Sequence, residues 1–146
     1  MKQRILIVDD EQEFAESLSE RLTIRGYEVA TSLNGQDALE KVKGYNFDVV
    51  ILDVLMPGMD GVEVLREIKK IKPLTEVIML TGNASVESAV EGMKLGAYDY
   101  LMKPCDTEEL LSKVNKAYER KAEQEERIRA AKVADIMSSP RSVLKE

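Results

Sequence analysis

A short, wholly apolar run at 49–52 leads directly into Asp53, and the turn Pro57-Gly58 follows soon after. An apolar run of this length, bounded by turn residues, is typical of a strand that is buried on both faces of a sheet. Two more runs of the same character lie at 5–8 and 77–80. Three such strands in one short chain predict a sheet that is covered by helices on both sides.

Apolar residues with helical spacing follow each of these strands. After the first, Phe14, Leu18 and Leu22 recur four residues apart, and Gly26 is a typical end for that helix. Two less apolar strands are expected at the sheet edges, and they lie at 27–31 and 98–102. Strand and helix thus alternate five times along the chain. This alternation predicts an α/β fold with a five-stranded, doubly wound parallel sheet in the order 2-1-3-4-5.

Composition limits the partners and the chemistry of such a domain. The net charge of −6 argues against nucleic acid as a partner, so we expect no direct contact with it. The lone Cys105 cannot form an internal disulfide, which fits a reducing compartment, and no apolar run is long enough to span a membrane. A cytoplasmic location is therefore expected. Because the chain contains no His, its chemistry must rest on carboxylates, Lys, Thr and a metal ion.

Polar residues follow four of the five predicted strands at the point where each strand ends. Asp9 and Asp10 end the first strand, Asp53 the third, Thr81 the fourth and Lys103 the fifth. Each alone is an ordinary turn or cap residue, but the carboxyl ends of parallel strands share one edge, where ligands bind. Three close carboxylates repel one another unless a hard cation such as Mg²⁺ joins them. With a Lys and a Thr added, the set suits a phosphoryl group.

The chain resembles the receiver domain of two-component response regulators, the CheY-like family. The resemblance covers roughly residues 3–120 and implies a flavodoxin-like fold. It depends on four segments in this order: Ile7-Val8-Asp9-Asp10-Glu11, Asp53-Val54-Leu55-Met56-Pro57-Gly58-Met59-Asp60-Gly61, Leu80-Thr81-Gly82 and Tyr100-Leu101-Met102-Lys103-Pro104.

The resemblance also implies roles for the acidic residues. Asp53 is the expected phosphoacceptor and takes a phosphoryl group from a phosphohistidine donor. Asp10 is expected to bind Mg²⁺ directly and Asp9 largely through water, with Asp53 and the Leu55 carbonyl as further ligands. The donor is expected to be a sensor histidine kinase or a histidine phosphotransfer protein, which docks in part on the first helix.

The remaining motif residues are expected to sense the phosphoryl group. The resemblance implies that Thr81 hydrogen-bonds it, that Lys103 pairs with it, and that the Lys103-Pro104 bond is cis. Tyr100 occupies the position of the aromatic switch residue, so phosphorylation should change the face around the fourth helix, the last strand and the fifth helix. Leu55 and Asn83 occupy positions that tune hydrolysis, and an apolar Leu55 predicts a slow rate.

The last helix is expected to run past the domain, to about Asp135. We predict a receiver domain at 1–120 and, at 121–146, a helical extension with a disordered tail. The extension is expected either to be a solvated, fraying segment or to act as a linker or dimerisation arm, with a phosphorylation-dependent homodimer as one outcome. The chain is expected to be a stand-alone regulator or the N-terminal fragment of a longer one, for example a transcriptional regulator.

As a phosphoacceptor, the chain is expected to catalyse only its own phosphorylation and dephosphorylation and to be otherwise no enzyme. Two other functions fit the sequence less well. A haloacid-dehalogenase-like phosphatase needs a second Asp two residues after its nucleophile, and Leu55 stands there. A scaffold that only dimerises through its last helix would not need the full set of acids and Lys103.

Overall fold

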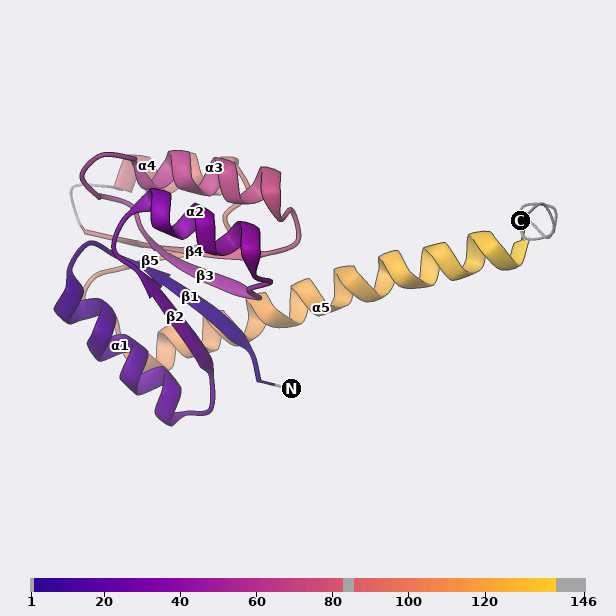
Figure 1. Ribbon diagram of the computed structural model, residues 1–146, viewed down its shortest axis with the longest axis horizontal. Helices are drawn as coiled ribbons and strands as arrows, with labels where there is room; N and C mark the ends of the chain where they lie inside the picture. The colour runs from indigo at the N-terminus through magenta and orange to yellow at the C-terminus, as the bar shows by residue number, and fades with distance from the viewer. Residues whose placement is uncertain (1, 83–85, 139–146) are drawn as a thin grey trace.

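In the computed structural model, which describes residues 2–82 and 86–138, five strands alternate with five helices (Figure 1). Each strand except the last leads into a helix that carries the chain back to the start of the next strand. The elements are β1 Arg4–Val8, α1 Gln12–Ile24, β2 Glu28–Ser32, α2 Gly35–Gly44, β3 Val49–Asp53, α3 Gly61–Ile71, β4 Glu76–Thr81, α4 Val86–Lys94, β5 Asp99–Met102 and α5 Thr107–Ser138.

The five strands form one parallel sheet in the order β2-β1-β3-β4-β5, which confirms the predicted topology and its edge strands. The register aligns the ends of neighbouring strands. Val8 lies beside Leu52, and Asp53 lies beside Leu80. The residues that follow β1 and those that end β3 and β4 therefore meet at one edge of the sheet, as the order of the strands requires.

Alternating side chains of the strands build two cores, one on each face of the sheet. One face holds Leu6, Val50 and Met79 among the residues that pack with α2 and α3. The other face holds Ile7 and Ile51 among those that pack with α1 and α5. Because β1, β3 and β4 are apolar on both faces, they occupy the centre of the sheet, and this burial fixes the positions of their ends.

The connection from β3 to α3 brings the start of a helix close to the last residue of β3. The Asp60 carboxylate caps α3 and accepts a hydrogen bond from the Val62 N–H at 3.0 Å. Gly61 passes so close to β3 that a Cβ atom there would lie 2.6 Å from the Asp53 carbonyl oxygen. Only glycine fits this close approach, and it keeps α3 packed behind the site.

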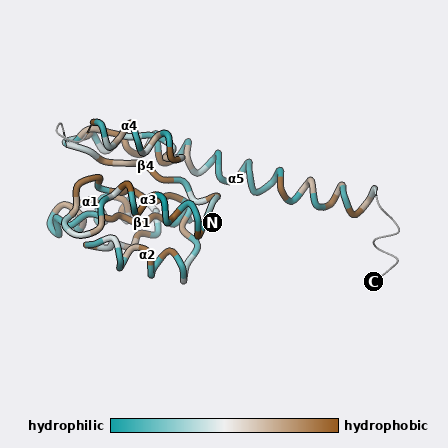
Figure 2. The backbone as a smooth tube through the Cα atoms, turned by 90° about the horizontal axis from the view of Figure 1, so that it is seen from above, coloured by the Kyte–Doolittle hydropathy of each residue, from teal (hydrophilic) through white to brown (hydrophobic). Residues whose placement is uncertain are grey.

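Helix α5 begins against the sheet and continues away from it as a single arm (Figure 1). It ends at Ser138, three residues beyond the predicted limit of about Asp135. Hydrophilic and hydrophobic residues are interspersed along the arm (Figure 2). The predicted disordered tail from Ser139 onward and the predicted role of Asn83 lie outside the described residues. Among the helices that can be described, none is both long and apolar enough to cross a membrane.

Candidate functional site

Three carboxylates meet at the carboxyl end of the sheet. Asp9 and Asp10 directly follow β1, and Asp53 is the last residue of β3. One carboxylate oxygen from each residue lies within 4.8 Å of those from the other two. Asp9 is 1% exposed and Asp53 6%, whereas Asp10 is exposed. The sequence-based expectation that these residues come together is confirmed, and their geometry suits a hard divalent cation that keeps some of its waters.

The pKa of Asp53 reflects this crowding. Burial and the neighbouring Asp9 raise the pKa of the Asp53 carboxyl to about 7, against the opposing effects of Lys103 and the Leu55 N–H. Negative charge at this point is therefore under-compensated by the protein itself. A bound cation would remove that cost, so the donor set fits the Mg²⁺ ion that the motif implies.

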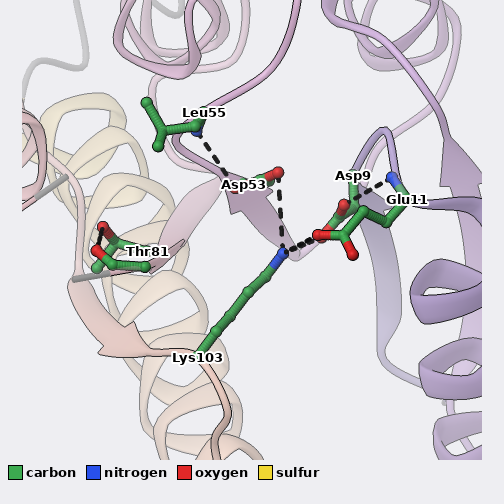
Figure 3. Close-up of polar contacts among 7 residues, drawn as sticks. Asp9, Glu11, Asp53, Leu55, Thr81 and Lys103 are labelled. Atoms are coloured by element: carbon green, nitrogen blue, oxygen red, sulfur yellow. Dashed lines mark hydrogen bonds and ion pairs between the residues drawn. The ribbon is translucent and has the colours of Figure 1, made fainter. Parts of the chain in front are cut away.

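Lys103 extends from the end of β5 into the same site (Figure 3). Its Nζ lies 2.7 Å from Asp9 Oδ2, 3.5 Å from Glu11 Oε1 and 3.8 Å from Asp53 Oδ2. Burial alone would lower the pKa of Lys103, but the hydrogen bond to Asp9 and the nearby acids raise it above its ordinary value. Lys103 is thus held as a cation between β1 and β3, and the cis Lys103-Pro104 bond agrees with the prediction.

Thr81 and Leu55 complete the rim around Asp53. In the view of Figure 3, Thr81 and Asp9 flank Asp53 on opposite sides. Thr81 is buried at the end of β4, and its hydroxyl donates a hydrogen bond to the Gly82 carbonyl at 2.9 Å. The Leu55 N–H donates to Asp53 Oδ1 at 3.2 Å, while its side chain is 55% exposed at the mouth of the site.

The expected switch residue lies outside this cluster. Tyr100 is 36% exposed on the edge strand β5, and four further apolar side chains of β5 and α4 are exposed as well. These are Val86, Val90, Met93 and Met102.

Two contacts of Lys103 were not foreseen from the sequence. Its Nζ lies 4.5 Å from the centre of the Phe14 ring, and Glu11 approaches it from the turn after β1. Helical spacing predicts Phe14 on the apolar face of α1, where it does pack against the core, and the family resemblance predicts that the helix around Phe14 helps to dock the donor. Local spacing carries no signal for a contact between α1 and the end of β5, because the sheet topology alone brings them together.

A second polar cluster lies at the opposite, amino end of the strands. Glu76, at the start of β4, is 1% exposed and is bound by Arg120 of α5. Asp48, just before β3, pairs with Lys121 at 3.2 Å. The cluster joins α5 to the sheet at the point where the helix leaves it. Nothing in the local pattern around these residues predicted it, because both partners are far apart in sequence.

Comparison with known proteins agrees with this geometry. The sequence model of the response regulator receiver domain matches residues 5–115. The regulatory protein AtoC of Escherichia coli is 40% identical over 123 residues, which cover 84% of this chain and 27% of AtoC. The transcriptional regulatory protein ZraR of Salmonella typhimurium is 40% identical over 139 residues, 93% of this chain and 32% of ZraR. The chain thus spans about a third or less of these two relatives.

Solved structures of receiver domains have the same fold as this chain. A CheY-like receiver domain protein from Methanospirillum hungatei superimposes with a TM-score of 0.81 at 33% identity, covering 85% of this chain and 99% of the other. A receiver domain from Clostridium thermocellum gives 0.79 at 38% identity, with coverage of 82% and 97%. Because the family model matches most of its length, and the fold and the motifs agree, the chain belongs to the response regulator receiver domain family.

Proposed function

We propose that this receiver domain takes a phosphoryl group from a phosphohistidine donor onto Asp53, with Mg²⁺ as its cofactor, and that the modification changes its interaction face. The observation that carries the proposal is the meeting of three carboxylates within 4.8 Å, with the Lys103 ammonium 3.8 Å from Asp53. This combination supplies a nucleophile, a place for a cation and a fixed positive charge.

Asp9, Asp10 and Asp53 would hold the metal, with the Leu55 carbonyl as a further ligand. When bound, Mg²⁺ supplies positive charge to the oxygens of the transferring group and offsets the repulsion among the acids. Asp10, the exposed member of the three, would meet a hydrated ion at the surface. Asp9 already accepts a hydrogen bond from the Glu11 N–H and pairs with Lys103, which suits binding of the metal through a water molecule.

The chain's own residues would then carry the transfer. An Asp53 carboxylate oxygen attacks phosphorus, the bond from phosphorus to the donor's imidazole nitrogen breaks, and an aspartyl phosphate forms. Lys103 needs only a small movement to pair with a phosphoryl oxygen on Asp53. The Thr81 hydroxyl would exchange its bond to the Gly82 carbonyl for one to another phosphoryl oxygen. The exposed, apolar Leu55 side chain offers no group to orient water, which favours slow hydrolysis.

The partners follow from the same chemistry. A sensor histidine kinase or a histidine phosphotransfer protein would supply the phosphoryl group. Exposed apolar side chains at Val90, Met93 and Tyr100 support a binding face around α4, β5 and α5 that responds to phosphorylation, with Tyr100 as its switch residue. A homodimer is one expected outcome of that response. The larger relatives favour a role for this chain as the receiver part of a longer transcriptional regulator.

The test is the intact mass of the protein after incubation with acetyl phosphate, with Mg²⁺ or with EDTA. We expect one Mg²⁺-dependent phosphoryl group in the wild type and none in Asp53→Asn. Asp60→Asn is the matched control, because Asp60 lies in the same loop, and Asn still caps a helix. Absence of the adduct from the wild type would contradict the proposal and favour a scaffold that acts without phosphorylation.

A further inference from the structure

We propose that Phe14 is a positioning residue for Lys103, and that its ring holds the lysine ammonium over the acidic cluster in a state ready to move. The kinetic part of this inference rests on the proposed function of Asp53. The structural part does not, because it concerns only the contact between a ring and an ammonium group.

The geometry of the contact is direct. Phe14 is the third residue of α1, and its half-buried side chain packs against the core on the α1 and α5 face of the sheet. The Lys103 Nζ lies 4.5 Å from the centre of the ring, within the range of a cation–π attraction. The Lys103 side chain is only 18% exposed, so water screens this attraction little.

The ring differs in kind from the other partners of the ammonium. Asp9, Glu11 and Asp53 are acids at 2.7, 3.5 and 3.8 Å, and each can hold Nζ by a directed interaction. An aromatic face attracts a cation over a broad area and accepts no strong, directed hydrogen bond. The flexible lysine stem can therefore shift its ammonium from Asp9 toward Asp53 while the ring still attracts it.

Without the ring, the balance among these contacts changes. The nearest acid, Asp9, would hold the ammonium more firmly, and water would occupy the space of the ring. Lys103 would then reach a phosphoryl oxygen on Asp53 less often. Mg²⁺ binding should change little, since the three acids stay in place. The expected consequence is a slower transfer step at saturating donor and saturating Mg²⁺.

An ordinary core role for Phe14 predicts something else, and two substitutions separate the roles. Phe14→Leu keeps an apolar side chain but removes the ring, whereas Phe14→Tyr keeps the ring. Leu18→Val is the matched control, because Leu18 is a buried apolar residue of the same helix and the same core, and it has no aromatic ring. A merely structural role would make the effect of each variant follow its loss of stability.

The first readout is spectroscopic and independent of phosphorylation. The Lys103 ε-methylene protons are assigned by their absence in Lys103→Arg. We expect them upfield of their ordinary position in the wild type and in Phe14→Tyr, because they lie near the face of a ring. They should return to the ordinary position in Phe14→Leu. Resonances that are not displaced in the wild type, or that Phe14→Leu leaves displaced, would overturn the inference.

The second readout is the rate of phosphorylation by acetyl phosphate, a donor too small to use a protein docking surface. We expect Phe14→Leu to be about threefold to tenfold slower at saturating donor, with its Mg²⁺ affinity unchanged. Phe14→Tyr and Leu18→Val should stay within about twofold of the wild type. Equal rates for Phe14→Leu and Phe14→Tyr would overturn the positioning role. A wild type that takes up no phosphoryl group would instead contradict the proposed function, while the spectroscopic result would stand.

Discussion

The two ends of the sheet bury the same kind of group and treat it differently. Each of the neighbouring strands β3 and β4 has an acid at or next to its amino end, Asp48 and Glu76, and a polar residue at its carboxyl end, Asp53 and Thr81. Glu76 and Asp53 are both almost fully buried, at 1% and 6% exposure. The difference lies in the charges that surround them.

At the amino end, cations match the acids. Glu76 accepts two hydrogen bonds from Arg120, one of them at 2.8 Å from Nη2, and Lys69 approaches it at 3.5 Å. Asp48 accepts from Lys121 at 3.2 Å and from the Arg4 backbone N–H at 2.9 Å. The hydrogen bond to Glu76 raises the pKa of Arg120. This end is electrostatically complete, and it anchors α5.

At the carboxyl end, acids outnumber cations. Asp9, Glu11 and Asp53 share Lys103, with Asp10 close by. The comparison shows that burial of an acid does not by itself indicate function. We infer that an acid is functional where the folded chain supplies too little positive charge to balance it, so that a bound ligand must supply the rest. Four predictions test this contrast between the two ends.

The largest effect is expected at the matched end. Glu76→Gln removes a buried charge that Arg120 and Lys69 need, so it should lower the free energy of unfolding by about 3 kcal/mol. Urea denaturation measures it, with the exposed Glu87→Gln as control. A loss below about 1 kcal/mol would mean that the Glu76–Arg120 pair contributes no more than a weak surface ion pair, and it would contradict the contrast between the two ends of the sheet.

Addition of Mg²⁺ should act only at the other end. A free concentration one hundredfold above Kd should stabilise the wild type by about 2.7 kcal/mol. Asp10→Asn should be stabilised less by Mg²⁺ than the wild type. Glu76→Gln should be stabilised by Mg²⁺ as much as the wild type, although it is less stable without the ion. Thermal unfolding with Mg²⁺ and with EDTA checks the prediction. Equal gains in Asp10→Asn and the wild type would argue against Asp10 as a ligand.

Neutralisation of Asp53 should raise the free energy of unfolding, whereas neutralisation of Glu76 should lower it. The folded pKa of Asp53 is about 7, above its ordinary value of 3.8, so the native state binds more protons between these values. In EDTA, this carboxyl's contribution to stability therefore falls as pH rises from about 4 to about 7. Asp53→Asn should be more stable than the wild type by about 2 kcal/mol at pH near 8, less than the full pKa shift would give because water partly screens the site, and the gap should close near pH 4. Urea titrations at both pH values measure the gap, and a destabilised Asp53→Asn at the higher pH would contradict the prediction.

The smallest effect is expected where α5 leaves the sheet. Asp48→Asn keeps an acceptor for the Arg4 N–H but weakens the pairing with Lys121, which also contacts Glu125 at 3.1 Å. A loss of about 1 kcal/mol in local stability is expected. Hydrogen exchange of the amides at 118–126 should accelerate about fivefold, while phosphorylation stays unchanged. Unchanged exchange at 118–126 would indicate that packing, rather than the ion pair, stabilises α5 where it leaves the sheet.

Much of the fold was predictable because its signals are local. The apolar runs, the alternation of strand and helix and the residues at strand ends together predicted the sheet order and the meeting of Asp9, Asp53 and Lys103. The contacts of Phe14 with Lys103 and of Glu76 with Arg120 were not predictable in this way. Each joins elements far apart in sequence, and an aromatic on the inner face of a helix or a charge in a helix gives no sign of its partner.

The most direct test of the account is to locate the phosphoryl group. Borohydride reduction of the phosphorylated protein converts an aspartyl phosphate to homoserine, which peptide mass spectrometry assigns to a position. We expect homoserine at position 53, in samples prepared with Mg²⁺ and not in those prepared with EDTA. Reduction at Asp9 or Asp10 instead, or a modification of Asp53 that does not depend on Mg²⁺, would contradict the claim that the unmatched end of the sheet is a metal-assisted phosphoacceptor site.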